Sequence, residues 1–184
     1  MERHEKLRLW GQWILASFAA IALFEFLANT TVRIGVSYRS YFFLIFLVLI
    51  SGFQWLFVLR SLSFVKPWGW VIATTIGYIL GGVGSIPATQ SLSLGLIGLI
   101  IGGIIWGGVL GSFQWLVLRH KFAKSGLWVL ANIIGFTMWV PLIGTGISEM
   151  GILGDYILSI FTGGISGAVL VWLVEQHSQD NLIT

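Results

Sequence analysis

Cysteine is absent from this sequence. Its absence excludes disulfide bonds, cysteine-ligated zinc, iron–sulfur clusters and thiol catalysis. Histidine is nearly absent too, because the three residues His4, His120 and His177 all fall in flanks or loops outside the apolar runs. An axially ligated haem inside a membrane span is therefore not expected. The sequence also has no phosphate-binding glycine loop with a lysine and no metal-ligand cluster, so it identifies no cofactor or metal.

Charged residues are scarce, at 9% of 184 residues, whereas soluble proteins have roughly a quarter. In their place, 57% of the residues are hydrophobic and form six apolar runs, near 10–27, 41–59, 68–86, 92–118, 127–147 and 156–174. A helix of about 20 apolar residues crosses a bilayer. The runs are apolar on every face, whereas barrel strands alternate. We therefore predict an all-α integral membrane protein with six transmembrane helices.

The predicted organisation is a single transmembrane domain over residues 1–184, with cytoplasmic tails at 1–9 and 176–184. The N-terminal run has no signal-peptidase-like exit, so we interpret it as an uncleaved first helix. The expected location is a bacterial inner (plasma) or thylakoid membrane, crossed several times. The lipid bilayer is the first expected partner.

The basic residues favour one orientation. They precede the first run or lie between runs two and three or four and five: Arg3, Lys6, Arg8, Arg60, Lys66, Arg119, Lys121 and Lys124. The positive-inside rule then places both termini in the cytoplasm, with Arg33 and Arg39 as dissenting residues. Cations in such groups flank a membrane, so no nucleic-acid partner is expected. Most tryptophans fall near the same predicted interface, where indole rings favour the headgroup zone: Trp10, Trp13, Trp55, Trp68, Trp70, Trp115, Trp128 and Trp172.

Two short motifs recur along the chain. Phe53-Gln-Trp-Leu56 returns as Phe113-Gln-Trp-Leu116, and a Trp-x-x-Ala motif begins at Trp13, Trp70 and Trp128. The recurrence predicts three helical hairpins, near 10–60, 68–119 and 127–175, related by a pseudo-threefold axis along the membrane normal. Chance similarity between apolar segments is the alternative explanation for the Trp-x-x-Ala matches.

The stretch from Trp106 to Arg119, which contains Phe-Gln-Trp-Leu-Val-Leu-Arg, together with Gly126-Leu-Trp-Val-Leu-Ala131, resembles repeat units of uncharacterised small bacterial membrane proteins of a cyanobacterial type. The resemblance covers about the middle two thirds of the chain. It implies repeated membrane hairpins and no activity, and it assigns no functional residue.

Glycines crowd the apolar runs, and several are four residues apart, such as Gly103, Gly107 and Gly111. Small residues at that spacing let helix axes approach closely in lipid. The interpretation we favour is packing within the chain. Contact between copies in a homo-oligomer is the alternative.

Four polar residues inside the runs are ligand-binding candidates. Gln54 and Gln114 lie deep enough that an unpaired amide would be costly, and Asn132 is similar in kind. The amides either form hydrogen bonds between helices or face an axial cavity and hold a ligand. Glu25 is the one ionisable residue well inside a run, which marks a functional candidate, unless it extends to the outer interface and meets Arg33.

Glycine and proline residues near the far ends of the third and fifth runs are candidate helix breaks: Gly82, Pro87, Pro141 and Gly144. Broken helices at matching places in repeats often surround a binding site. The alternative is that these residues merely end helices.

The residues favour a non-enzymatic protein. Gly164-Ile-Ser166-Gly167 resembles the nucleophile motif of rhomboid proteases, but no histidine lies in a span to activate Ser166. We expect an accessory or scaffold subunit that binds lipid, pigment or another membrane protein. The alternative is a small-solute transporter, channel or substrate-binding membrane component with its site on the pseudo-threefold axis, built from Glu25, Gln54, Gln114 and Asn132.

Overall fold

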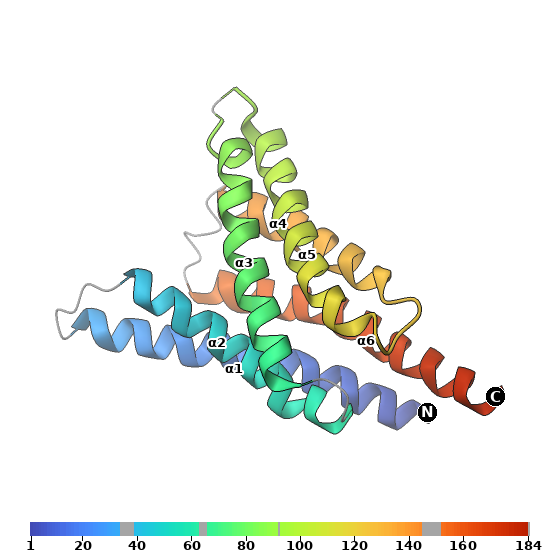
Figure 1. The fold of residues 1–184 in the computed structure, drawn as a ribbon. Coiled ribbons are helices and arrows are strands. Elements are labelled where there is room, and N and C mark those ends of the chain that lie inside the picture. Colours follow the sequence, from blue (N-terminus) through green and yellow to red (C-terminus); the bar gives the residue numbers. More distant parts are fainter. Residues whose placement is uncertain (34–38, 63–65, 92, 145–151, 184) are drawn as a thin grey trace.

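The computed structural model describes residues 1–33, 39–62, 66–91, 93–144 and 152–183, and every element in these ranges is helical. The elements are α1 (Arg3–Arg33), α2 (Arg39–Phe57), a short 3-10 helix η1 (Leu59–Leu62), α3 (Pro67–Thr89), α4 (Gly95–Leu118), α5 (Gly126–Gly144) and α6 (Ile152–Ile183) (Figure 1). The all-helical prediction is confirmed for the described part of the chain.

Four helical segments are long and apolar enough to cross a membrane: Arg3–Phe24, Pro67–Thr89, Gly95–Leu118 and Ser159–Gln179. Two shorter apolar segments, Ile45–Phe57 and Gly126–Pro141, lie in α2 and α5. Large apolar side chains such as Ile72, Val83 and Ile97 are more than half exposed on the outside of these helices. Apolar outer faces of this extent fit lipid rather than water, and the chain is a multi-pass membrane protein.

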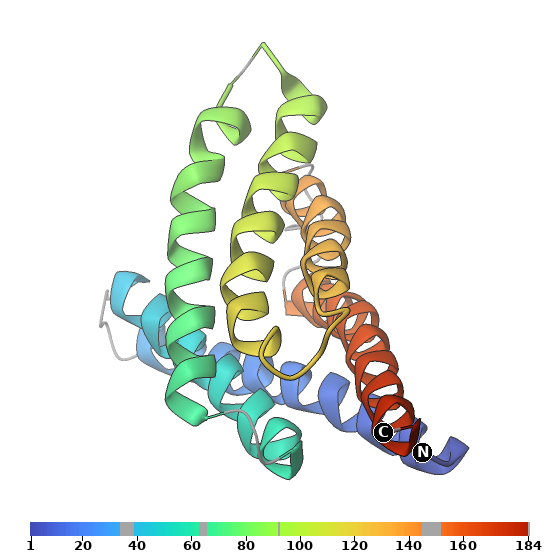
Figure 2. The ribbon, with the colours of Figure 1, turned by 45° about the vertical axis from the view of Figure 1, so that its right-hand side comes forward.

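The six α-helices form a closed ring in the described part of the chain. Each helix packs against its neighbours along the sequence, and α6 packs against α1. The two chain ends consequently lie close together, whereas the turn between α3 and α4 and the far ends of α1 and α2 point in different directions (Figures 1 and 2). The hairpins thus meet at one end of the molecule and diverge toward the other, with an interior bordered by all six helices.

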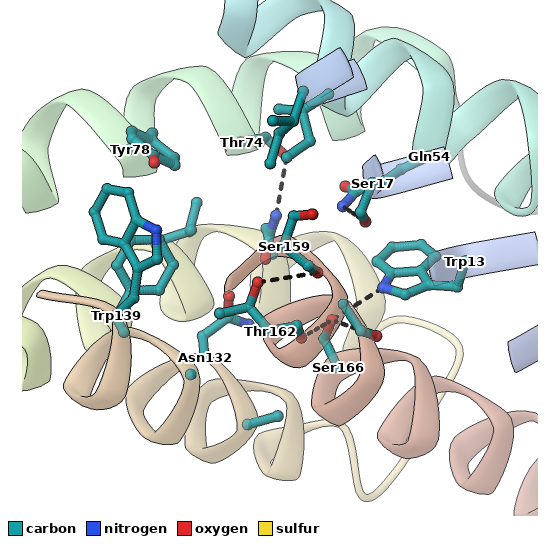
Figure 3. Close-up of a pocket in the computed structure, with 18 of the residues that line it drawn as sticks. Trp13, Ser17, Gln54, Thr74, Tyr78, Asn132, Trp139, Ser159, Thr162 and Ser166 are labelled. Atoms are coloured by element: carbon teal, nitrogen blue, oxygen red, sulfur yellow. Dashed lines mark hydrogen bonds between the residues drawn. The ribbon is translucent and has the colours of Figure 1, made fainter. Parts of the chain in front are cut away.

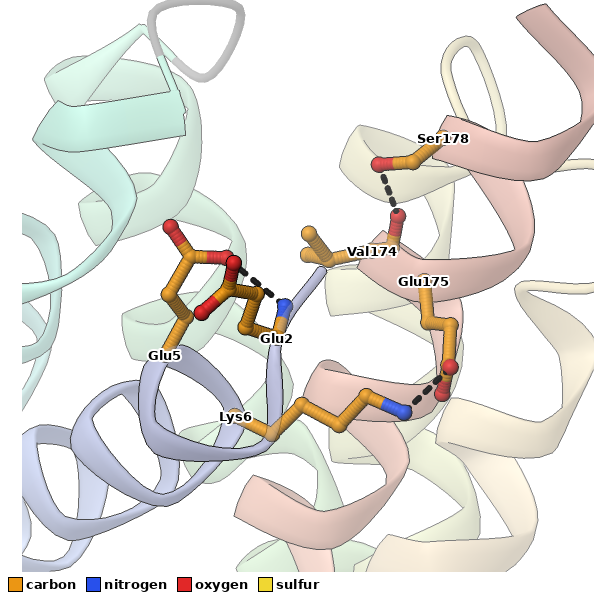
Figure 4. Close-up of polar contacts among 6 residues, drawn as sticks. All are labelled: Glu2, Glu5, Lys6, Val174, Glu175 and Ser178. Carbon is orange, nitrogen blue, oxygen red and sulfur yellow. Dashed lines mark hydrogen bonds and ion pairs between the residues drawn. The ribbon is translucent and has the colours of Figure 1, made fainter. Parts of the chain in front are cut away.

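The outermost helices extend beyond the predicted spans. Helix α1 begins at Arg3 and α6 continues to Ile183, so the predicted tails 1–9 and 176–184 are largely helical. Their side chains also meet: the Lys6 ammonium pairs with the Glu175 carboxylate (Figure 4). This ion pair joins the first and last helices near the chain ends.

The predicted helix breaks at Gly82, Pro87 and Pro141 are wrong, because α3 and α5 continue through these positions. Pro87 and Pro141 lie in the last turns of their helices. Each proline lacks the N–H that would bond to the carbonyl four positions earlier, a loss that membrane helices tolerate where neighbouring groups hold the backbone. Gly144 is the last helical residue of α5.

Glycines bring the backbones of α3, α4 and α5 close together. A Cβ atom at Gly103 would lie 2.5 Å from the Phe136 carbonyl oxygen, and one at Gly111 would lie 2.8 Å from the Val129 Cα. On α3, a Cβ at Gly81 would lie 2.7 Å from Trp106 of α4. Any larger residue at these positions would force the helices apart.

Candidate functional site

Three tryptophans meet at the centre of the ring. Trp13, Trp70 and Trp128 come from α1, α3 and α5, and each is at most 1% exposed. Their ring centroids are 5.5, 5.8 and 6.0 Å apart in edge-to-face pairs, the arrangement that aromatic quadrupoles favour. We call these residues the tryptophan triad.

The structure adds a direction to the sequence prediction. The three tryptophans do not face outward, because each is buried and packs against the other two inside the ring. Trp10 and Trp68, at 39% and 76% exposure, remain on the outside. Only the direction in which a helix face points separates the two groups, and the motif alone does not give that direction.

Apolar side chains close the interior around the triad. The buried members of this cluster come from both chain-end helices and from the segments after α2 and α4: Leu9, Val58, Leu59, Leu118, Phe122, Leu170 and Leu173. Their burial at 0–8% exposure leaves no gap for solvent on that side. The triad is therefore part of a dry closure at the end where the hairpins meet.

Two glutamines connect neighbouring helices beside the triad. Trp70 Nε1 donates to Gln54 Oε1 at 3.3 Å, and Gln54 Nε2 donates to Ser17 Oγ at 3.2 Å. Gln54 thereby joins α1, α2 and α3. Its amide is 8% exposed and would be costly without these partners.

Gln114 repeats the arrangement on the next helices. Trp128 Nε1 donates to Gln114 Oε1 at 2.8 Å, and Gln114 Nε2 donates to Thr74 Oγ1 at 3.1 Å. These bonds join α3, α4 and α5. We call each set a glutamine bridge. Hydrogen bonding between helices, one of the two interpretations of these amides, is what the structure shows.

The third tryptophan has a different partner. Trp13 Nε1 donates to Ser166 Oγ of α6 at 2.9 Å, and that hydroxyl donates to the Thr162 carbonyl oxygen at 2.9 Å. Ser166 is engaged as an acceptor and a donor, as in a packing serine. Beside it, Trp10 Nε1 donates to the Gly164 carbonyl oxygen at 2.9 Å. Helix α6 thus joins α1 without a glutamine.

A cavity lies beside the triad and is bordered by all six helices (Figure 3). Its volume is about 100 Å³. One water needs about 10–15 Å³ on a comparable scale, so the cavity has room for about seven to ten water-sized groups. The lining on α1 and α5 follows a four-residue spacing from the triad, such as Trp13, Ser17 and Ile21. The cavity therefore continues along the inner helix faces from the closed end.

The lining combines neutral polar groups with aromatic rings and contains no Asp, Glu, Lys, Arg or His among the described residues. The polar members are Ser17, Gln54, Thr74, Gln114, Asn132, Ser159, Thr162 and Ser166, and the aromatic ones are Trp13, Phe46, Tyr78, Trp128, Phe136 and Trp139. The described part of the wall thus offers a ligand hydrogen bonds and ring contacts.

Three of the four predicted ligand-binding candidates line this one cavity: Gln54, Gln114 and Asn132. Glu25 lies in α1, but its side chain falls outside the described residues, as does that of Arg33. The glycine and proline candidates are absent from the lining.

Sequence reasoning did not single out Ser17 and Thr74. Their signal was present, since Ser17, Thr74 and Asn132 each stand four residues after a triad tryptophan. That spacing places a polar group one turn above the ring on the same helix face.

Three further buried polar atoms have no hydrogen-bond partner in the described residues: Thr75 Oγ1, Trp106 Nε1 and Thr137 Oγ1. None of the three residues lines the cavity. A search of the described ranges finds no group of His, Asp and Glu residues that could hold a metal ion.

No family model matches the chain, and comparisons with curated proteins and with solved structures also find no match.

Proposed function

We propose that the chain crosses the bilayer six times, with both termini in the cytoplasm. In support, α2 and α5 stand in the ring between helices that are long enough to span, so a bilayer around those helices also surrounds α2 and α5. The cations of segments 59–66 and 119–125 lie at the end of the ring that carries both termini. Tilts of up to about 40° are ordinary for membrane helices, which accommodates diverging hairpins.

This topology has a direct test, because the chain has no cysteine of its own. Single cysteines at two exposed loop positions, His120→Cys and Ser93→Cys, can be labelled with a membrane-impermeant maleimide on intact cells. The Ser93→Cys variant should react from outside, and His120→Cys should react only after the membrane is opened. The reverse pattern, or equal reactivity, contradicts the proposal.

The three hairpins are proposed to be repeats about a pseudo-threefold axis through the triad. The support is a shared register. Helices α1, α3 and α5 each carry a triad tryptophan and, four positions later, a small polar residue, and α2 and α4 each carry the glutamine of a glutamine bridge. The axis then passes through the cavity. In transporters with parallel repeats, the shared interface is a common place for a site.

The function that this geometry supports best is non-enzymatic binding of a small uncharged molecule in the central cavity. The single observation that carries the proposal is a cavity bordered by all six helices whose described lining is neutral, polar and aromatic. The protein would act as a binding or accessory component of a membrane, whether the ligand is a lipid-soluble metabolite, part of a lipid or a pigment fragment.

Transport is the second candidate, and the cavity itself favours it. A solute that leaves toward the cytoplasm would have to pass the triad, whose rings are at most 1% exposed. Transport thus requires the three rings to separate, whereas binding does not. Uptake by proteoliposomes of whichever molecule is found in the cavity distinguishes the two functions.

The decisive experiment compares two Ile→Phe variants. Ile50 lines the cavity, whereas Ile134 of α5 is 44% exposed on the outer surface. After mild detergent extraction, mass spectrometry should find a small molecule bound to the wild-type protein. Ile50→Phe should reduce its occupancy about tenfold by filling the space, and Ile134→Phe should leave it unchanged. If nothing is bound, or both variants behave alike, the proposed function is rejected.

A further inference from the structure

The three hairpins use polar groups unequally around the cavity, and the difference points to the ligand. One turn after each triad tryptophan stands a polar side chain: Ser17, Thr74 or Asn132. Ser17 and Thr74 each accept a hydrogen bond from a glutamine amide on α2 or α4. Asn132 has no such neighbour, because α6 carries no glutamine before Gln176, and Val171 stands where the Trp-Leu motif would place one.

The orientation of the Asn132 amide follows from its one hydrogen bond. Asn132 Nδ2 donates to the Trp128 carbonyl oxygen at 2.9 Å. A carbonyl can only accept, so the NH₂ group faces the backbone and Oδ1 points elsewhere. No hydrogen bond to Oδ1 is present among the described residues, and Asn132 lines the cavity. One N–H of the same amide is also unused.

The other amides that line the cavity are already engaged. In each glutamine bridge, Oε1 accepts from a tryptophan and Nε2 donates to a hydroxyl. Ser166 accepts from Trp13 and donates to its own helix. Asn132 is therefore the one side-chain amide of the described lining whose oxygen has no hydrogen-bond partner among the described residues.

We infer that the cavity binds a small uncharged carboxamide, whose amide takes the place of the absent third glutamine. This inference rests on the proposed binding function and names its ligand class. The ligand N–H donates to Asn132 Oδ1, and its carbonyl oxygen accepts the remaining Asn132 N–H. Its apolar body lies against rings such as Phe136 and Trp139, which follow Asn132 along α5 and line the same cavity. Figure 3 shows Asn132 and Trp139 on the wall of this pocket, with Ser159, Thr162 and Ser166 of α6.

The size of the cavity agrees with this class. Room for about seven to ten water-sized groups accommodates one ring with an amide substituent.

The test uses benzamide and acetophenone as probes. The two have the same number of non-hydrogen atoms and the same carbonyl, but acetophenone carries a methyl group where benzamide carries NH₂. Titration calorimetry on the purified full chain in detergent, against a detergent blank, should give about tenfold tighter binding of benzamide. Asn132→Leu should abolish the preference, and Asn132→Thr, which supplies the hydroxyl that α3 has at Thr74, should restore most of it.

Gln176→Leu is the control, because this glutamine near the end of α6 does not line the cavity. This variant should keep the preference for benzamide over acetophenone. If benzamide and acetophenone bind equally, or if the preference survives Asn132→Leu, the inference is overturned while the binding function stands. If neither probe binds, the inference is overturned, and the occupancy comparison of Ile50→Phe with Ile134→Phe decides separately whether the binding function stands. Should Asn132→Leu not fold, the ratio of the two wild-type affinities decides alone, and a ratio near one overturns the inference.

Discussion

The ring joins its helices in two different ways. From α1 to α5, two glutamine bridges connect consecutive helices through buried amides, and glycines bring α3, α4 and α5 into backbone contact. Helix α6 joins α1 through three other contacts. The Ser166 hydroxyl accepts from Trp13, the Gly164 carbonyl oxygen accepts from Trp10, and Lys6 and Glu175 form an ion pair near the chain ends. The comparison teaches that similar helices can be joined through buried amides and backbone contacts in one part of a ring and through hydroxyl, carbonyl and ion-pair contacts where it closes.

This difference has an energetic basis. In lipid, helices gain nothing from hiding apolar surface, so close packing and hydrogen bonds decide which interfaces are strong. Where a glycine contacts the backbone of the next helix, a larger residue is destabilising because backbone atoms cannot move aside. A serine hydroxyl already bonded to its own helix adds less. We therefore expect substitutions in α4 to cost more stability than equivalent ones in α6.

The largest effect is expected at Gly107. A Cβ atom there would overlap the carbonyl group of Asn132, a backbone atom of α5 that cannot move aside cheaply. Gly107→Ala should lower the free energy of unfolding by about 3 kcal/mol, the upper end of ordinary overpacking. Thermal unfolding in detergent measures it.

Gly108→Ala is the matched control, because its Cβ would meet only the Ile133 side chain at 3.7 Å, an ordinary contact. Equal stability of the two variants would show that α4 and α5 are not packed backbone to backbone.

Removal of a glutamine bridge should come next. Gln114→Leu leaves the Trp128 indole N–H and the Thr74 hydroxyl without their partner in a buried site, at a cost of about 2 kcal/mol. Gln54→Leu should cost somewhat less, because its bonds of 3.2 and 3.3 Å are longer. Denaturant unfolding of both variants beside Gln176→Leu tests this order, and no loss at either bridge would contradict it.

At the interface that α6 forms with α1, Ser166→Ala should cost about 1 kcal/mol. The change removes the acceptor of the Trp13 indole, while the Trp10 bond to Gly164 stays in place. Ser112→Ala, whose hydroxyl bonds only to its own helix at Gly108, is the control and should cost less. A larger loss for Ser166→Ala than for Gln114→Leu would reverse the comparison between the two parts of the ring.

The smallest effect is expected at the Lys6–Glu175 pair. Both side chains remain partly exposed, at 34% and 25%, so water and salt screen their attraction. Glu175→Gln should cost about 0.2–1 kcal/mol, and the difference from wild type should shrink as salt is raised. Unfolding midpoints at low and high ionic strength measure it, and a large difference that ignores salt would rule out a screened surface pair.

Several features could be predicted from residues alone. Apolar runs of spanning length have to satisfy their backbone groups internally, which determines helices, and the location in a membrane follows from the same runs. The need of Gln54 and Gln114 for partners was also predictable, because an amide deep in an apolar run is costly when unpaired. The six helices of the structure match the six runs within a few residues except at the chain ends.

Other features depended on tertiary structure. The Trp-x-x-Ala motif cannot say whether its tryptophan points outward to a headgroup or inward to a ring axis, because both positions favour the same side chain and only the neighbouring helices differ. The predicted breaks at Gly82, Pro87 and Pro141 failed for a related reason. A proline removes one helical hydrogen bond, and whether the helix continues depends on the groups packed around it, which the local sequence does not specify.

What the sequence determined and what the tertiary structure decided differ in how far apart along the chain the contributing residues lie. Composition and the lengths of the apolar runs determined the solvent, the helices and which polar groups needed partners, since these depend on each residue and its close neighbours along the chain. Only the tertiary structure decided that three indoles meet inside the ring, that two glutamines and an asparagine share one cavity, and that the Asn132 oxygen alone among those three amides has no partner in the described residues. Those facts depend on which helix faces come together in space, and packing of all six helices determines that at once.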